Sequence, residues 1–375
     1  MYDIPNSRAS ITGKELTYLQ QALQSGHLHG DGAFTEKCHQ LLENRYGVAK
    51  VLLTHSGTGA LEMAAWLGEI QPGDEFIVPS FTFSSTANAF ALRGGIPVWC
   101  DIRSDTLNLD ESQIENLITE RTKAIVPVHY GGVGCEMDTI MDIATRHRIL
   151  VVEDAAQAIE TFYKGRPLGT LGDFGCLSFH GSKNIVAGEG GALFINDERS
   201  IERSEIIREK GTNRSQFLRG QVDKYRWIDI GSSYLPSELT AAFLLAQLEE
   251  IKAITNRRLA VWQQYIERLT PFADAGKLSL PSIPPDCRHN GHLFYILLPN
   301  ETERNRVMNA MQAKGILAIF HYVPLHLAPA GKRLDKSVKL PCTEEYSRRL
   351  LRLPMYADIT HEEVDAVVTT LDRVL

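Results

Sequence analysis

The sequence GCLSFHGSKNIVAGEGGALFI, residues 175–195, contains two short apolar runs separated by a polar, glycine-rich loop. We predict buried strands over 176–179 and 192–195, joined by a loop that carries Lys183 and ends in the turn 188–191. Burial disfavours the charged form of a lysine and therefore favours an amine that can act as a nucleophile. A surface hairpin with an exposed lysine is the better explanation of this stretch taken alone, and only the sequence upstream changes that.

Helices and strands alternate along the sequence before this stretch. Thr12 and Glu15 form a predicted capping box for a first helix that should end near Gly26. Further helices are predicted over 35–46, 57–70, 86–92, 111–118 and 137–147, and apolar strands over 51–53, 75–79, 97–101, 124–128 and 149–152. Continuous apolar strands between amphipathic helices indicate an α/β fold with a large, mostly parallel sheet that is covered on both faces.

The pattern changes after about residue 235. One long helix, or two in series, is predicted over 237–269, followed by a linker at 281–285. The remainder is predicted as a strand (293–298), a helix (302–314), a strand (317–320) and two late helices. We therefore expect a large domain over residues 1–250 and a smaller α+β C-terminal domain over residues 251–375.

Composition excludes several classes of function. The chain has 375 residues, 43% of them hydrophobic and 23% charged, as in an ordinary globular protein. A net charge of −7 without a basic tract gives no case for nucleic-acid binding. No apolar run is long enough to span a membrane, and the first residues lack a signal-peptide core. Six scattered cysteines without a CxxC pair predict reduced thiols and a cytoplasmic protein.

Three elements could carry chemistry. The turn SGTG at 56–59 lies between a strand and a helix, where free backbone N–H groups favour a phosphate, although glycine is common in any such turn. Asp154 follows a buried strand, at the sheet edge where open α/β sheets bind ligands. It could pair with a protonated pyridine nitrogen or simply cap the next helix. Gln157, three residues later, could reach the same ligand or face solvent.

Together with Lys183, these elements match the chemistry of pyridoxal 5′-phosphate (PLP). Its phosphate needs N–H donors, its ring nitrogen a carboxylate and its aldehyde a lysine amine. Phe81 could stack on the ring, although Phe83 or a purely structural phenylalanine stays possible. No metal site is expected, because His321 and His326, like the other histidines, lack zinc-ligand spacing. A G-x-S-x-G esterase elbow is also absent.

The sequence resembles the PLP-dependent sugar aminotransferases of the DegT/DnrJ/EryC type, which fold like aspartate aminotransferase (the type I PLP fold). The resemblance runs from about residue 13 to the C-terminus. The motifs that carry it are SGTGAL (56–61), PSFTFSSTANA (79–89), EDAAQ (153–157), LSFHGSKN (177–184) and GEGGAL (188–193).

The resemblance implies a role for individual residues. Lys183 would attach the cofactor and move the proton, Asp154 would pair with the ring nitrogen, and His180 would orient the substrate. The remaining implied cofactor contacts are Gly57, Thr58 and Ser178 to the phosphate, Phe81 to the ring face and Gln157 to the ring hydroxyl. Many members have an asparagine at the position of Ser233, and that asparagine reaches the neighbouring subunit's cofactor phosphate. Ser233 would take its place here. Implied substrate contacts are Arg219, Tyr225, His321, Tyr322 and His326.

The resemblance also implies a reaction. Segments 126–141, 209–239 and 320–326 look like members that act in enterobacterial common antigen synthesis, a cell-surface polysaccharide pathway. These members convert dTDP-4-keto-6-deoxyglucose and L-glutamate to dTDP-4-amino-4,6-dideoxygalactose and 2-oxoglutarate. A homodimer with composite active sites would follow. The gluco epimer (dTDP-viosamine), a C3-aminating enzyme and a non-catalytic PLP-binding regulator are the alternatives.

Overall fold

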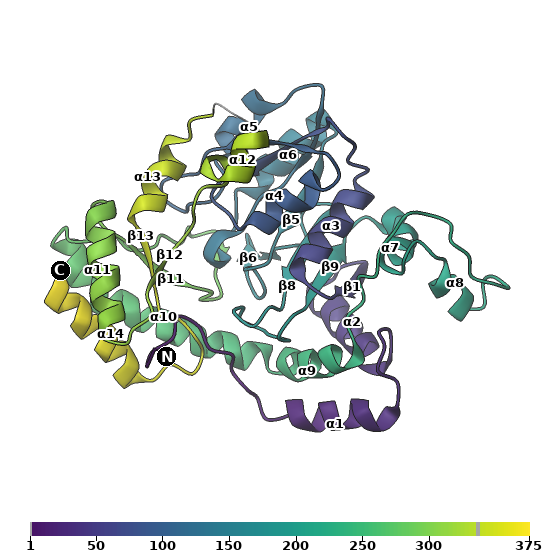
Figure 1. Ribbon diagram of the computed structural model, residues 1–375, viewed down its shortest axis with the longest axis horizontal. Coiled ribbons are helices and arrows are strands. Elements are labelled where there is room, and N and C mark those ends of the chain that lie inside the picture. The colour runs from purple at the N-terminus through teal and green to yellow at the C-terminus, as the bar shows by residue number, and fades with distance from the viewer. Residues whose placement is uncertain (1, 335–337) are drawn as a thin grey trace.

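A seven-stranded sheet forms the centre of the protein in the computed structural model, which describes residues 2–334 and 338–375 (Figure 1). Its strands follow the order β1-β9-β8-β5-β4-β2-β3. Only β9 runs antiparallel to its neighbours, while the other adjacent pairs are parallel. The predicted mixed, mostly parallel sheet is thus confirmed. The strand bounds are β1 (Lys50–Thr54), β2 (Glu75–Pro79), β3 (Ile96–Cys100), β4 (Thr122–Ile125), β5 (Leu150–Asp154), β8 (Phe174–Ser178) and β9 (Gly191–Ile195).

The sheet separates two hydrophobic cores because its side chains alternate between the faces. Val51 and Leu53 of β1 pack into one core, whereas Leu52 packs into the other. The first core is completed by α2 (Ala33–Tyr46), α5 (Glu111–Leu117), α6 (Met137–His147) and α9 (Glu238–Glu249). The second is completed by α3 (Gly57–Leu67), α4 (Ser84–Ala91) and α7 (Ile201–Arg208). Burial on both faces explains why the strands are continuously apolar.

A second, three-stranded antiparallel sheet lies toward the C-terminus, in the order β11-β13-β12. It packs against α10 (Ile251–Asp274), α11 (Glu301–Ala313) and α14 (His361–Val374) in a core of its own, which Ile4 from the N-terminal segment also joins. The bounds of its strands are β11 (Phe294–Leu297), β12 (Ile319–Phe320) and β13 (Leu350–Leu353). The division of the chain at residue 250 stays a prediction.

Glu153 fixes the segment that leads into β8. Its fully buried carboxylate accepts hydrogen bonds from the backbone N–H groups of Gly169, Leu171 and Gly172, at 2.7–2.8 Å. His129 Nε2 lies 2.9 Å from the same carboxylate. Because its neighbour along β5 is Asp154, this network also sets the position of the residue at the strand end.

The first helix differs from its prediction. α1 (Glu15–Ser25) ends at Gly26, as expected, where a positive φ of 71° suits glycine. Its start is not a capping box, because Glu15 is its first residue rather than its third. The Glu15 carboxylate accepts the N–H groups of Thr12 and Gly13, but the Thr12 hydroxyl does not cap the helix. Gln247 of α9 donates to the same carboxylate, which ties α1 to α9.

Other differences are short elements with weak sequence signals. Of the two alternatives for 237–269, two helices in series is the correct one, since α9 ends at Glu249 and α10 begins at Ile251. Not predicted were β6 (Phe162–Tyr163), β7 (Arg166–Pro167), β10 (Cys287–Arg288) and β13 among the strands, and α7 and α8 (Arg214–Leu218) among the helices. Two late helices were predicted after β12, but the described residues form three there: α12 (Pro329–Leu334), α13 (Pro341–Arg349) and α14.

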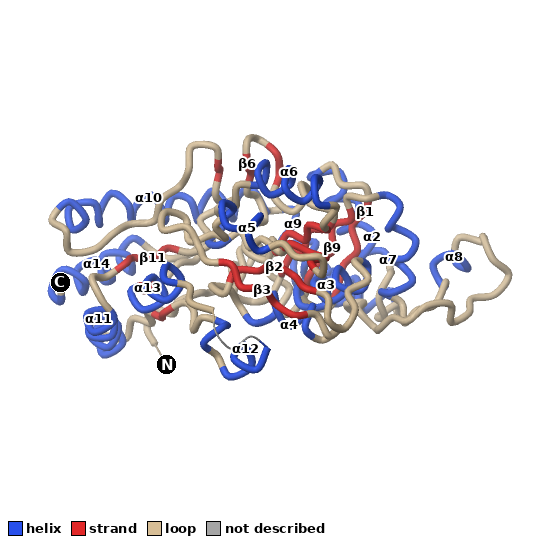
Figure 2. Tube along the Cα trace, turned by 90° about the horizontal axis from the view of Figure 1, so that it is seen from above, coloured by secondary structure: helices blue, strands red, loops and turns tan. Residues whose placement is uncertain are grey.

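The segment around α8 projects from the body of the molecule at one end (Figures 1 and 2). Several large apolar side chains on it are exposed, with Trp227 the most exposed at 77%. The others are Phe217, Leu218, Tyr225, Ile228 and Ile230. We call residues 209–233 the projecting segment.

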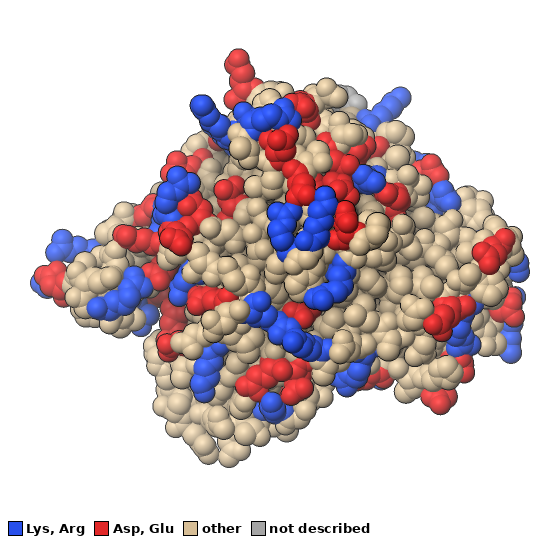
Figure 3. Space-filling view, turned by 180° about the vertical axis from the view of Figure 1, so that it is seen from behind, with Lys and Arg blue, Asp and Glu red and all other residues tan. Residues whose placement is uncertain are grey.

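The distribution of surface charge and the state of the cysteines are those of an ordinary globular protein. On the face in Figure 3, acidic and basic side chains are interspersed and neither gathers into a continuous patch. All six cysteines are free. Among residues 2–334 and 338–375, no helix has the length and apolarity that crossing a bilayer requires.

Candidate active site

A cavity of about 460 Å³ opens where the loops that follow β1, β2, β4, β5 and β8 meet. Parallel strands place their carboxyl ends at one edge of the sheet, so residues distant in sequence come together there. Nine of the predicted site residues line this cavity: Gly57, Thr58, Asp154, Gln157, Ser178, His180, Lys183, His321 and Tyr322.

The turn after β1 is shaped to hold an anion. Ser56 caps α3 by accepting the Gly59 N–H at 3.0 Å, while the N–H groups of Gly57 and Thr58 have no acceptor within the helix. A Cβ on Gly57 would lie 2.8 Å from the Ser178 Cβ, and one on Gly191 would lie 2.5 Å from the Gly57 nitrogen. Both glycines are therefore required for β1, β8 and β9 to bring these donors together.

Asp154 is buried at the end of β5 and lines the cavity. One carboxylate oxygen accepts the Thr86 hydroxyl at 2.7 Å, and the other accepts the Ala156 N–H at 3.1 Å. The contact to Ala156 is local, and the helix cap that the sequence left open is wrong, because the element that follows β5 is the strand β6 rather than a helix. The contact to Thr86 of α4 comes from a different element, and it orients the carboxylate at the cavity wall.

Lys183 lies in the loop after β8 and is partly buried. Burial lowers the pKa of its amine to about 8, the nearby Asp154 charge raises the pKa, and the charge of Arg352 lowers it. A lysine with this pKa is uncharged near neutral pH far more often than an ordinary lysine, which favours a nucleophilic amine. The surface hairpin with a solvated lysine is therefore wrong.

Gln157, His321 and Tyr322 form another part of the cavity wall. Gln157 Nε2 donates to the Tyr322 hydroxyl at 3.1 Å, and its Oε1 accepts the Gly131 N–H at 2.7 Å. The rings of His321 and Tyr322 are stacked with centroids 3.9 Å apart. His180 lies at the exposed mouth of the cavity, where its Nδ1 is 2.8 Å from the Ser182 hydroxyl.

The prediction that Phe81 stacks on a ligand ring is wrong. Phe81 is 1% exposed and packs edge-on against Tyr130 and Tyr322 in the interior. Phe83, two residues later, is 63% exposed and lines the cavity. The motif left both phenylalanines open, and only the turn after β2 decides which one faces the ligand.

Four other predicted residues do not line this cavity. His326 is buried against Ser80, with its Nδ1 2.7 Å from the Ser80 hydroxyl, because the short turn at Leu325–Leu327 faces inward. The remaining three, Arg219, Tyr225 and Ser233, lie in the projecting segment. Arg219 pairs with Glu205 on the same chain. Within one chain, a direct substrate or cofactor role for these four is not supported.

The cavity also contains residues that the sequence did not single out. Thr86 holds Asp154, and His292 Nδ1 lies 2.8 Å from the Asn184 side-chain oxygen, next to Lys183 in the chain. Arg352 enters from β13. A cation in a short strand gives no signal in the sequence, because the register that turns it inward depends on tertiary packing. Ser85 and Glu189 are further members of this group.

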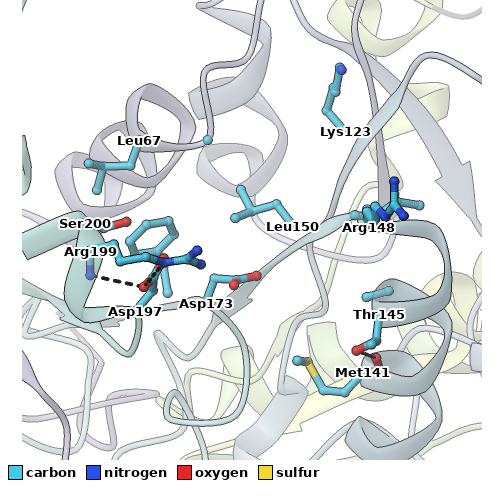
Figure 4. Close-up of a pocket in the computed structure, with 14 residues that line it drawn as sticks. Leu67, Lys123, Met141, Thr145, Arg148, Leu150, Asp173, Asp197, Arg199 and Ser200 are labelled. Carbon is cyan, nitrogen blue, oxygen red and sulfur yellow. Dashed lines mark hydrogen bonds and ion pairs between the residues drawn. The ribbon is translucent and has the colours of Figure 1, made fainter.

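A second cavity, of about 490 Å³, lies at the opposite edge of the sheet (Figure 4). Its lining includes Lys123, Arg148 and Asp173, and Asp197 there pairs with Arg199. It contains none of the predicted site residues, whereas the first cavity brings Asp154, Lys183 and the 56–59 turn together, so we assign the chemistry to the first cavity. In the described part of the chain, no three histidine, cysteine or acidic side chains are grouped as metal ligands would be.

Comparisons with known proteins agree on one family. The model of the DegT/DnrJ/EryC1/StrS aminotransferase family matches residues 9–372. The GDP-perosamine synthase of Caulobacter vibrioides is 32% identical over 382 residues, covering 100% of both chains. The PLP form of Spr1654 from Streptococcus pneumoniae superposes with a TM-score of 0.91 at 27% identity, covering 100% of both chains. Helicobacter pylori PseC, an aminotransferase of pseudoaminic acid biosynthesis, has a TM-score of 0.92 at 25% identity, covering 99% of this chain and 98% of its own.

The residues in the cavity fit PLP. The Gly57 and Thr58 N–H groups and Ser178 would hold the phosphate, Asp154 would face the ring nitrogen, and Lys183 would carry the aldehyde carbon. Phe83 offers an exposed ring to stack on the cofactor. Gln157 also lines the cavity and would hydrogen-bond the ring hydroxyl.

We predict that Lys183 in the cofactor-free protein becomes reactive at a midpoint near pH 8. Because the Asp154 charge favours the protonated amine, Asp154→Asn should lower that midpoint. Competitive acetylation across a pH series, quantified by mass spectrometry of the peptide containing Lys183, measures it. The exposed Lys252 is the internal control and should give one profile in both proteins. An unchanged Lys183 midpoint in Asp154→Asn would contradict the electrostatic coupling.

Alanine substitutions of the two phenylalanines should affect different properties, the stability for Phe81 and the affinity for PLP for Phe83. Phe81→Ala should reduce the free energy of unfolding by about 3–5 kcal/mol, because it empties a packed interior site. Phe83→Ala should change that free energy by less than about 0.5 kcal/mol, yet weaken PLP about tenfold through lost stacking. Urea unfolding without cofactor and a fluorescence titration with PLP provide both values. Weaker PLP binding in Phe81→Ala at unchanged stability would restore the original prediction.

Proposed function

We propose that this chain, which belongs to the DegT/DnrJ/EryC1/StrS aminotransferase family, transfers the amino group of L-glutamate to a nucleotide-linked 4-keto-6-deoxy sugar. As a member of that family it is a PLP-dependent sugar aminotransferase. One observation carries the proposal. A lysine with lowered pKa, a buried carboxylate and an anion-binding turn line the same cavity.

The roles of the residues follow from their positions. When bound, PLP supplies an aldehyde that takes up and returns the amino group, and a ring that withdraws electrons from the reacting carbon. Asp154 would hold the ring nitrogen in its charged form, with Thr86 fixing the carboxylate. Lys183 Nζ would take the proton from the donor's α-carbon and later deliver a proton to the sugar carbon. The face from which Lys183 delivers that proton would set the configuration of the new amine.

Our first candidate substrate is dTDP-4-keto-6-deoxyglucose, giving the galacto product dTDP-4-amino-4,6-dideoxygalactose. The similarity of 126–141, 209–239 and 320–326 to enzymes with that product supports it. A second candidate is the corresponding GDP-linked 4-keto sugar, because a full-length relative is a GDP-perosamine synthase. Both share the reaction at C4 and differ in the nucleotide and in the sugar configuration. We place the reaction in the cytoplasm, since six free thiols suit a reducing compartment.

Turnover with the two keto sugars should identify the substrate. With L-glutamate, we expect the dTDP sugar to be aminated and to give small proton couplings between H3, H4 and H5, because the new C4 amine is axial. Mass spectrometry and NMR of the purified product provide the measurement, and Lys183→Ala is the inactive control. Two large couplings would assign the gluco epimer, and preference for the GDP sugar would assign the second candidate.

We further propose a homodimer in which the projecting segment covers the partner subunit's cavity. Its large side chains are exposed on one chain, and burying them against a second copy would be favourable. Arg219, Tyr225 and Ser233 would then reach the site of the partner subunit, although they do not line the cavity of their own chain.

Mixing two inactive variants should restore activity if the sites are composite. One chain carries Lys183→Ala, and the other carries Arg219→Ala with Ser233→Ala. Random pairing leaves one intact site in half of the dimers, so about one quarter of the wild-type activity should return. Turnover after mixing, with sedimentation to verify the dimer, tests this. An active monomer or a mixture without activity would refute the arrangement.

A further inference from the structure

Arg352 enters the cavity because of the alternation of side chains along β13. Its neighbours Leu351 and Leu353 are fully buried in the core of the C-terminal sheet. Arg352 therefore lies on the other face of the strand, which also carries Leu350. Its register partner on β11, Tyr295, belongs with Leu350 to a different apolar cluster. On this face the guanidinium reaches the cavity that contains Lys183.

His321 orients the guanidinium without neutralising it. Arg352 Nη1 lies 2.7 Å from His321 Nε2. Since a guanidinium only donates, Nε2 accepts, and the ring proton is on Nδ1, 3.3 Å from the Tyr130 hydroxyl. Burial lowers the pKa of His321, and the charges of Arg352 and Lys183 lower it further. His321 is therefore a neutral partner.

The charge of Arg352 has no anionic partner among residues 2–334 and 338–375. No carboxylate there forms an ion pair with Arg352, and its buried Nε makes no hydrogen bond. Arg352 is partly buried, and two fully buried arginines have partners of their own within the protein. Arg208 pairs with Asp31, and Arg258 donates to backbone carbonyl groups, including those of Gly291 and His292.

A buried cation without a counter-charge is unfavourable, and a ligand anion removes that cost. The Gly57–Thr58 turn and Ser178 are already assigned to the cofactor phosphate. Of the lysines and arginines among the described residues, Arg352 and Lys183 are the two that line the cavity. The remaining anions that must enter are the carboxylates of the amino donor and the nucleotide of the sugar.

We propose that Arg352, oriented by His321, binds a carboxylate of the amino donor, an inference that rests on the proposed transamination. A planar guanidinium matches the two oxygens of a carboxylate, and hydrogen bonds between charged groups are the strong ones. The position of Arg352 beside Lys183 places this carboxylate near the amine that moves the proton. His321 is then a positioning residue, rather than the direct sugar contact that the sequence suggested.

The donor half-reaction isolates this role. Holoenzyme is mixed rapidly with L-glutamate, and the loss of the cofactor's visible band is followed without sugar. Arg352→Gln should raise the half-saturating glutamate concentration about 10- to 100-fold, while Arg352→Lys should have a smaller effect. The second half-reaction, between the pyridoxamine form and the keto sugar, should change less than about twofold. Arg306→Gln on α11, where the exposed Arg306 pairs with Glu303, is the matched control and should change neither.

L-Glutamine shows which carboxylate is bound, and either result supports the inference. If Arg352 binds the side-chain carboxylate, Arg352→Gln removes the preference for glutamate over glutamine. If it binds the α-carboxylate, both donors weaken in parallel.

Three results overturn the inference. An unchanged donor half-reaction with a weakened sugar half-reaction would assign Arg352 to the nucleotide phosphates. A proportional loss in both half-reactions, with a lower melting temperature, would make it structural. Unchanged kinetics in both would give it no role. Wild-type enzyme that does not react with L-glutamate would instead reject the donor of the proposed function.

Discussion

The close approach of three backbone segments at the carboxyl edge of the large sheet is the constraint on which the site depends. Gly57, Ser178 and Gly191 belong to the turn after β1, the end of β8 and the start of β9. A side chain at either glycine would collide with backbone or with Ser178, and the segments would separate. Their contact places the free N–H groups of α3 opposite the loop that carries Lys183. The glycine-rich character of both motifs is therefore a packing requirement with a functional consequence.

Buried charge is the second organising feature, and the two buried carboxylates of β5 are stabilised by different partners. Glu153 is surrounded by N–H donors and serves the fold. Asp154, one residue later, has its carboxylate held by Thr86 and lines the cavity. Alternation along β5 directs two adjacent carboxylates to opposite environments, so one is structural and the other meets the ligand.

Among the described residues, neither Lys183 nor Arg352 forms an ion pair with a carboxylate. Lys183 has a lowered pKa because burial outweighs the attraction of Asp154, and Arg352 faces a neutral histidine. A cavity with unpaired cations suits substrates that bring several negative charges, as an amino acid donor and a nucleotide sugar both do. The same electrostatics would hold the phosphate of the cofactor. The site is thus incomplete without its ligands.

The sequence alone determined the fold class, the order of the large sheet's elements along the chain, and PLP as the cofactor, while the residues that contact PLP stay predictions. Strand ends and glycine turns are local signals, so they were sufficient to single out Asp154, Lys183 and the 56–59 turn as parts of one site. They could not decide between Phe81 and Phe83, nor show that His326 turns inward to Ser80. No sequence pattern identified Arg352 as a site residue, because β13 is short and its register depends on pairing with two strands. These outcomes rest on contacts between residues far apart in the chain, which local propensity does not encode and which only tertiary packing decides.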